Sequence, residues 1–221
     1  MPIQLLKNNN QNAAAGLPYA IKTIITNHQH LFMRYLFFSV ILFSVISSCK
    51  QSSVKGKNGV TYKNAIEYND YIVNRQTKMM KSVVEFGKVA DISLDSAGLM
   101  LKQSVRDAEK MIAELKGMPP YKGDSALRDA AIASFSFYKK VFEKDYVDIL
   151  NIRKKGQENI TEEDVAEANR IVEKISKDEE VLDKAFQNAQ KDYATKNKMK
   201  LVNNSAQKEL QNELDKLGKE N

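Results

Sequence analysis

The chain has almost none of the side chains on which the commonest metal and nucleophile sites depend. Among its 221 residues there are no tryptophans, one cysteine and two histidines, and both histidines, His28 and His30, precede Cys49. Residues 50–221 therefore exclude zinc sites made of Cys and His, cysteine nucleophiles, Ser-His-Asp triads and the Glu-x-x-His sites of di-iron bundles. A lone cysteine also excludes an internal disulfide.

Charge is spread evenly along the chain and indicates no nucleic-acid partner. The net charge is +6, of which residues 1–48 carry +3 through Lys7, Lys22 and Arg34, so residues 49–221 carry +3. Lysines alternate with acids and form no dense basic block with interleaved aromatics. A D-x-D-x-D-G calcium loop is also missing from the sequence. We therefore expect no cofactor, no metal and no bound nucleic acid.

One apolar run ends directly before the single cysteine. Residues 35–46 form an apolar core of 12 residues, preceded by Met33 and Arg34. This length is typical of a signal peptide and too short for a membrane span, which takes about 20 residues. The last residue of the run is the aliphatic member of a lipobox, in which two small residues and a cysteine follow: Ile46, Ser47, Ser48 and Cys49.

The lipobox predicts a bacterial lipoprotein that is lipidated at Cys49. In such proteins the thiol is linked to diacylglycerol, and after cleavage the new amino group is acylated, for instance with palmitate. Two or three acyl chains make a stable membrane anchor, whereas one does not. The alternatives are an ordinary signal peptide and a buried helix with an incidental cysteine.

The lipobox also sets the expected boundaries and location. Residues 1–48 are leader and signal peptide, with Met33 as an alternative start. Residues 49–62 predict a flexible lipidated tether because they are rich in Ser, Lys, Asn and Gly, with almost nothing to bury. In enterobacterial lipoproteins, Asp directly after the lipidated cysteine favours sorting away from the outer membrane. This chain has Lys50 at that position, which by analogy indicates the outer membrane. The surface face and the periplasmic face both stay open.

Helical periodicity predicts an all-α domain over residues 63–202. Capping or stop residues separate four apolar stripes: Asn64, residues 91–93, Gly117, Asp124, Gly156 and Thr161. Stripes of about 25–35 residues with short connections predict an up-and-down antiparallel four-helix bundle, and no stretch is typical of a strand. Residues 203–221 predict an amphipathic C-terminal tail, which either packs on the bundle as a short fifth helix or stays mobile.

Several features of the helices have both a functional and a structural interpretation. The aromatic stripe of the third helix either lines an apolar-ligand pocket or is core, which is the commoner case: Phe135, Tyr138, Phe142 and Tyr146. The polar group of the first helix is either a buried network or, as we favour, a solvated face: Asn69, Asp70, Asn74 and Gln76. The acids at 162–164 and 178–180 could bind cations, but roles at helix ends and on the surface explain them. The loop at 119–124 is interpreted as a stiff connector between helices in preference to a recognition tip.

Three of these stretches resemble a family of uncharacterised bacterial surface lipoproteins. Residues 68–73 (YNDYIV) look like the first-helix signature of that family, and residues 119–124 followed by residues 125–131 (SALRDAA) add to the likeness. The resemblance covers residues 64 to about 201. It implies a helical, lipid-anchored surface or envelope protein and supplies no catalytic residues to carry over.

The sequence thus predicts a lipid-anchored envelope lipoprotein that acts as a non-catalytic binding or structural module. Its expected partners are the membrane, through the lipid on Cys49, and an envelope protein or an external ligand. The alternative is a carrier or sensor of a small apolar ligand held in the bundle core. An enzyme using Asp, Glu, Tyr or Lys is least favoured, because residues 50–221 contain no histidine to act as a base near pH 7.

Overall fold

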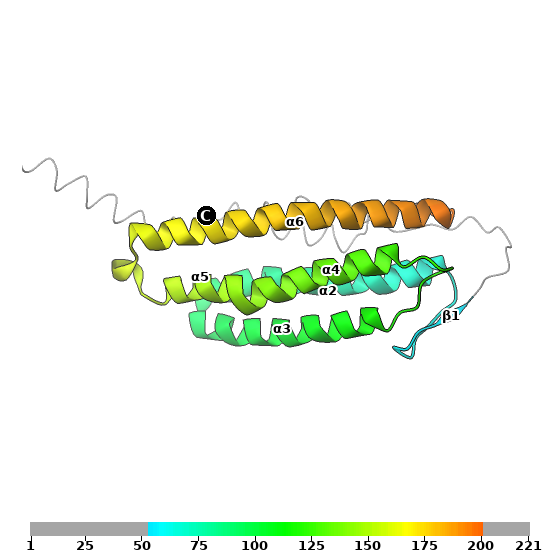
Figure 1. The fold of residues 1–221 in the computed structure, drawn as a ribbon. Coiled ribbons are helices and arrows are strands. Elements are labelled where there is room, and N and C mark those ends of the chain that lie inside the picture. The colour runs from blue at the N-terminus through cyan, green and yellow to red at the C-terminus, as the bar shows by residue number, and fades with distance from the viewer. Residues whose placement is uncertain (1–52, 201–221) are drawn as a thin grey trace, which may run out of the picture.

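The computed structural model describes residues 53–200, which are mostly helical with one small sheet (Figure 1). The elements in chain order are β1 (Val54–Lys55), β2 (Thr61–Tyr62), α2 (Ala65–Ile92), α3 (Leu94–Lys116), α4 (Ala126–Lys140), the π-helical turn η1 (Val141–Asp145), α5 (Tyr146–Arg153), the 3₁₀ turn η2 (Gln157–Asn159) and α6 (Glu162–Lys196). The all-α prediction is confirmed at this level. The lipobox, the signal peptide and the predicted tail at 203–221 lie outside the described residues.

The helices lie side by side along one long direction, and consecutive helices run in opposite senses, except that α5 continues in the direction of α4 (Figure 1). Because α4, η1 and α5 follow one another without a break, they form one long rod. This rod packs against both α3 and α6, and α2 packs against α3. Among the described residues no helix is long and apolar enough to cross a bilayer.

The predicted caps fix where the helices begin. The Asn64 side chain accepts a hydrogen bond from the Glu67 backbone N–H at 2.9 Å, and Ser93 ends α2 and caps α3. Thr161 and Asp164 exchange reciprocal side-chain-to-backbone bonds at the start of α6, which is a capping box. Each cap satisfies amide groups that the first helical turn leaves without partners.

The stretch before α2 is folded, which corrects the prediction of a flexible tether reaching residue 62. β1 and β2 pair as an antiparallel hairpin, and Tyr62 is buried, with 1% of its surface exposed. Residues 56–60 form the loop between the strands, in which the Gly59 N–H donates to the Gly56 carbonyl at 3.1 Å and Gly59 takes a positive φ of 79° that suits glycine. The expectation of no strand was therefore wrong here, because Asn-Gly is itself a hairpin signal.

One apolar core runs along the helices. Its largest fully buried side chains are Tyr62, Tyr68, Phe86, Phe135, Phe142, Ile72, Met79, Leu101 and Leu115. Phe86 of α2 stacks on Tyr146 of α5, with ring centroids 4.7 Å apart and an angle of 10° between the planes. Aromatic side chains of α2 and α5 therefore share one interior, and such rings dominate the energetics of a core.

A π-helical turn interrupts the long rod at Val141–Asp145, where the periodicity predicts regular α-helix. Its wider turn places Phe142 in the core and leaves Asp145 buried beside it. Such turns are rare and are frequent at functional sites.

Candidate functional site

The aromatic stripe of α4, η1 and α5 lies in the core, as favoured. All four members are at least 96% buried: Phe135, Tyr138, Phe142 and Tyr146. Phe142 and Tyr146 lie against each other with ring centroids 6.1 Å apart. Their rings therefore fill space with one another rather than surround a void.

The polar group of α2 is partly buried, so the prediction of a solvated face was wrong for two of its four members. Asn69 and Gln76 are buried, Asp70 is half-buried and Asn74 is exposed. The Asn69 Oδ1 accepts a hydrogen bond from Gln190 Nε2 of α6 at 3.0 Å. A buried amide pair of this kind is satisfied internally and connects α2 to α6.

The acids of α6 also divide between surface and interior. Glu162 and Glu163 are exposed, whereas the surface interpretation was wrong for Glu179, of which only 3% is exposed. Asp183, one turn further along the same face, is 6% exposed. Two acids therefore occupy positions of α6 where the helical period calls for apolar side chains.

Glu179 and Asp183 form a buried carboxylate site against the long rod. The Tyr138 hydroxyl donates a hydrogen bond to Glu179 Oε1 at 2.7 Å. Asp183 Oδ2 has no hydrogen-bond partner among the residues that the structure describes. On the same rod Asp145 is buried, with its Oδ2 3.6 Å from Lys174 Nζ of α6. A buried acid without a donor is costly unless it is neutral.

Burial controls the protonation of this site. Desolvation raises the pKa of the Asp183 carboxyl to about 7. It raises the pKa of Glu179 well above its usual range, although the hydrogen bond from Tyr138 works in the opposite direction. Burial and the nearby Glu179 likewise raise the pKa of Tyr138. Both acids therefore keep their protons to a higher pH than exposed carboxyls do, and Asp183 titrates near neutral pH.

Burial limits the chemistry that the carboxylate site on α6 can perform. Neither acid lines the open groove described below, and no cluster of three or more His, Cys, Asp or Glu with metal-binding geometry occurs within residues 53–200. A protonated, buried carboxyl pair changes stability with pH. It is not placed to touch a substrate that arrives from solvent.

An open groove runs between α3 and the π turn with α5. Its volume is about 740 Å³, and its apolar wall includes Leu101, Val105, Phe142, Val147 and Leu150. Charged side chains stand along its rim: Asp95, Lys102, Arg106, Glu143 and Lys154. This volume lies within the range of small-molecule sites. The sequence did not single out this surface, because its members come from two faces that only the fold brings together.

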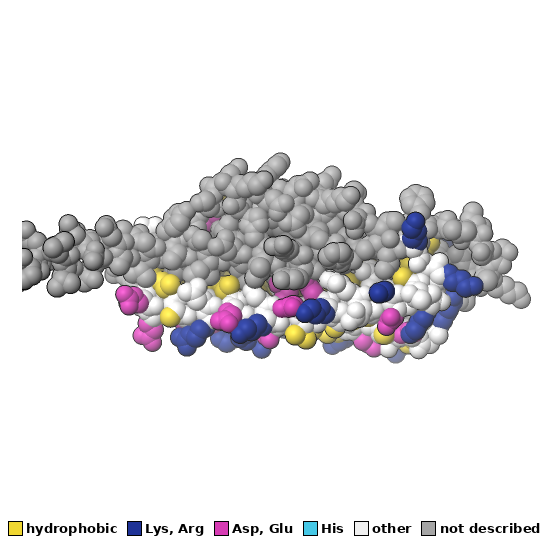
Figure 2. Space-filling view, turned by 90° about the horizontal axis from the view of Figure 1, so that it is seen from above, with side chains coloured by type: hydrophobic (Ala, Val, Ile, Leu, Met, Phe, Trp, Pro, Cys, Tyr) yellow, Lys and Arg dark blue, Asp and Glu magenta, His cyan; other side chains and the backbone are white. Residues whose placement is uncertain are grey.

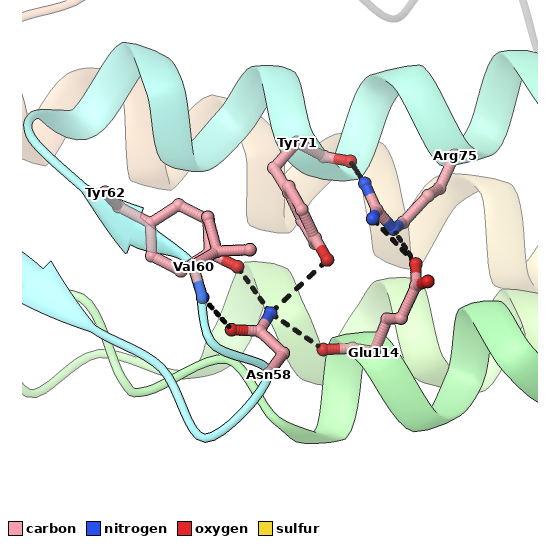
Figure 3. A network of polar contacts seen from close by, with 6 residues as sticks. All are labelled: Asn58, Val60, Tyr62, Tyr71, Arg75 and Glu114. Atoms are coloured by element: carbon pink, nitrogen blue, oxygen red, sulfur yellow. Dashed lines mark hydrogen bonds and ion pairs between the residues drawn. The ribbon is translucent and has the colours of Figure 1, made fainter.

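A polar network holds the hairpin to the ends of α2 and α3 (Figure 3). Asn58 Nδ2 donates to Tyr62 Oη at 2.6 Å and to the Glu114 carbonyl at 3.1 Å. Arg75 Nε donates to Glu114 Oε2 at 2.7 Å, and its guanidinium carbon lies 3.2 Å from the centroid of the Tyr71 ring. The hairpin is thereby part of the domain and not a separate linker.

Two details explain why the hairpin can pack so closely. A Cβ at Gly117 would lie 2.8 Å from the Asn58 backbone N, so glycine is required where α3 ends. Burial raises the pKa of Tyr62 to about 12. Its hydroxyl therefore stays neutral at physiological pH and keeps its hydrogen bond to Asn58.

Asn58→Ala is expected to lower the free energy of unfolding by about 1–3 kcal/mol, because the Glu114 carbonyl and the Tyr62 hydroxyl lose a donor in a partly buried place. Chemical unfolding measures this loss, and limited proteolysis is expected to cut residues 53–62 faster. Lys57→Ala, at an exposed position of the same turn, serves as the control and should change stability by less than about 0.5 kcal/mol. Equal effects of the two variants would contradict the role of the network.

The loop at 119–124 is packed, as a connector requires. Tyr121 and Asp124 exchange backbone hydrogen bonds at 2.9 and 3.0 Å, and Tyr121 is buried against Tyr68 and Tyr193. The Asp124 carboxylate accepts a bond from the Ala126 N–H at 2.9 Å, but the N-cap residue of α4 is Ser125 and not the predicted Asp124. The loop thereby joins the start of α4 to the end of α6.

Comparison with family models, with curated proteins and with solved structures finds no match to this chain. The resemblance of residues 68–73 and 119–131 to surface lipoproteins therefore stays a prediction. Function has to be argued from the residues and the geometry above.

Proposed function

We propose that this chain is a lipid-anchored bacterial envelope lipoprotein whose helical domain acts as a non-catalytic binding or structural module. The observation that carries the proposal is the lipobox, Ile46, Ser47, Ser48 and Cys49, after an apolar core of signal-peptide length. Cys49 is the one cysteine of the sequence, which suits a residue consumed by lipidation. The described fold begins at β1, five residues later. The domain would thus be held close to the lipid.

The four helical rods are proposed to form a closed up-and-down antiparallel bundle. In favour are the alternating helix directions (Figure 1), the single-residue connection at Ser93 and the shared core. Direct contacts between α2 and α6 support closure: Tyr193 donates a hydrogen bond to the Ala65 carbonyl at 3.0 Å. Bundles of this kind are common supports for binding surfaces.

A binding role is favoured over catalysis by the placement of the polar groups. Glu179 and Asp183 are shut inside the helices, and residues 50–221 contain no histidine. The groove between α3 and α5 has an apolar wall with a charged rim, which is typical of recognition surfaces. An envelope protein or an external molecule is the partner class that such a surface fits.

Protease treatment of intact cells tests the location that this proposal requires. A surface protein would lose the helical domain in intact cells. A periplasmic one would lose it only after the outer membrane is opened. The Cys49→Ser variant is the control, because it should leave the membrane fraction. If a purified domain turned over a substrate and one carboxylate substitution abolished that activity, the non-catalytic proposal would be wrong.

A second candidate is a carrier or sensor of a small apolar ligand. The stripe at 135–146 is packed, so the space that favours this function is the groove, where Phe142 reaches the wall. Native mass spectrometry of the protein from its own host tests it. A bound lipid or metabolite should be lost in Val105→Phe, which fills the groove, and kept in Val181→Phe at an exposed position of α6. An empty protein would count against this candidate.

A further inference from the structure

Lysines gather at the end of the domain that holds the hairpin, although the sequence spreads them over three separate segments. The segments are residues 53–64, 116–125 and 194–200. Together they contain one acid, Asp124, and eight exposed lysines, which we call the basic end: Lys55, Lys57, Lys63, Lys116, Lys122, Lys196, Lys198 and Lys200. The net charge of these segments is therefore +7.

Contacts between the three segments show that the basic end is one surface. The Asn58 N–H donates to the Gly117 carbonyl at 3.2 Å. The Lys196 ammonium lies 2.5 Å from Asp124 Oδ2. The rings of Tyr121 and Tyr193 meet beneath, with centroids 5.7 Å apart. Figure 2 shows Lys and Arg side chains gathered over this end of the molecule.

The opposite end of the helices has the other sign of charge. Residues 91–95 and 153–164 contain six acids, namely Asp91, Asp95, Glu158, Glu162, Glu163 and Asp164, and three bases, namely Arg153, Lys154 and Lys155. Their net charge is −3. The domain is thus charged oppositely at its two ends, along the direction of its helices. Such an asymmetry orients a protein in the field of a charged surface.

The chain that leads out of the basic end limits its distance from Cys49. Val54 of β1 is five residues after Cys49. Five residues span at most about 18 Å even when fully extended. If Cys49 carries the lipid, Val54 at the basic end lies no more than that distance from the lipidated residue. This limit is just under two Debye lengths at 0.1 M salt, where one Debye length is about 10 Å, so lysines beside β1 can come within the range in which surface charge attracts them.

We propose that the basic end is a second membrane contact, which binds anionic phospholipid headgroups and stands the helices away from the bilayer. The biological use of this contact rests on the proposed lipid anchor, but the surface itself does not. The acyl chains expected on Cys49 would hold the protein at the membrane, and the polybasic surface would set the orientation of the domain there. The contact would leave the groove, and the acidic end, directed toward partners.

Vesicle binding of the full-length chain with Cys49→Ser tests the surface without any lipid on the protein. The basic-end variant replaces Lys55, Lys57, Lys122 and Lys198 by Gln. The control variant replaces four exposed lysines from the sides of the helices: Lys81, Lys102, Lys110 and Lys140. Both variants lose the same charge, and circular dichroism checks that both keep their helices. The probes are vesicles of phosphatidylglycerol mixed with phosphatidylcholine, and of phosphatidylcholine alone.

The basic-end variant is expected to bind the phosphatidylglycerol vesicles at least about tenfold more weakly than the parent, and the control variant much less so. The difference should vanish on phosphatidylcholine alone and at about 1 M salt, where the Debye length is about 3 Å. Equal losses in the two variants, or equal binding by all three proteins, would overturn the proposal. Failure of acylation in cells would overturn the lipid anchor but leave this vesicle result unchanged.

Discussion

Asp183→Asn is expected to raise the free energy of unfolding at about pH 8 by about 2–4 kcal/mol. Burial raises the pKa of this carboxyl to about 7 in the folded protein, against about 3.9 in an unfolded chain. At about pH 8, above both pKa values, the folded state therefore buries a charged carboxylate, and each unit of difference between the two pKa values costs about 1.4 kcal/mol of stability. Asparagine has no charge to bury, so the variant escapes this cost.

The sign of the effect gives a characteristic pH profile. A carboxyl whose pKa is raised in the folded protein contributes stability that is fully present below about pH 4. This stability is lost as the pH rises to about 7. The parent should lose stability over this window, and Asp183→Asn should lose less. The raised pKa of Glu179 acts in the same direction, so some slope remains. Urea unfolding at a series of pH values measures both profiles.

Asp178→Asn is the matched control, because Asp178 lies on the same helix with its side chain 54% exposed. It should leave the slope unchanged and shift stability by less than about 0.5 kcal/mol. If Asp183→Asn destabilised the protein at about pH 8, or if the two variants had the same profile, Asp183 would not be a buried neutral acid. The assignment of the site on α6 would then be wrong.

Phe86→Ala is expected to lower the free energy of unfolding by about 3–5 kcal/mol, the range for truncating a buried aromatic ring. Phe86 is 1% exposed and stacks on Tyr146 across the domain. Its removal leaves a cavity between α2 and α5 and deletes a stacked ring pair. Thermal unfolding followed by circular dichroism measures the loss as a fall in Tm.

Ile92→Ala provides the control for that truncation, since Ile92 is on the same helix and 87% exposed. It should change stability by less than about 0.5 kcal/mol. If Phe86→Ala were equally mild, α2 would not share a core with α5, and the proposed closed bundle would fail. A single cooperative transition in the parent is expected on the same grounds.

The local signals of the sequence predicted the helical part of the fold well. Asn64, Ser93 and Thr161 cap helices where their side chains can reach the free amides of the first turn. The aromatic stripe is buried because its members recur at helical spacing, which needs no knowledge of partners. These features depend on residues three or four apart, and a sequence contains such information directly.

Features that depend on distant residues were missed. Asn58-Gly59 is a local turn signal, but the burial of Tyr62 depends on the rings of Tyr68 and Tyr71 in α2. The prediction that Asn69 lies on a solvated helix face was wrong, because its hydrogen-bond partner, Gln190, is 121 positions away in the sequence. Glu179 breaks an apolar stripe, and its burial follows from Tyr138 on another helix. The groove and the basic end likewise exist only once separate segments meet.

The lipid on Cys49 is the central claim, and labelling with palmitate in the host tests it most directly. The native chain and Cys49→Ser would be expressed side by side, and label would be measured on the protein in the membrane and soluble fractions. We expect label and membrane association for the native chain, and neither for Cys49→Ser. A native chain without label, or a Cys49→Ser chain that stays labelled and membrane-bound, would contradict the lipoprotein assignment.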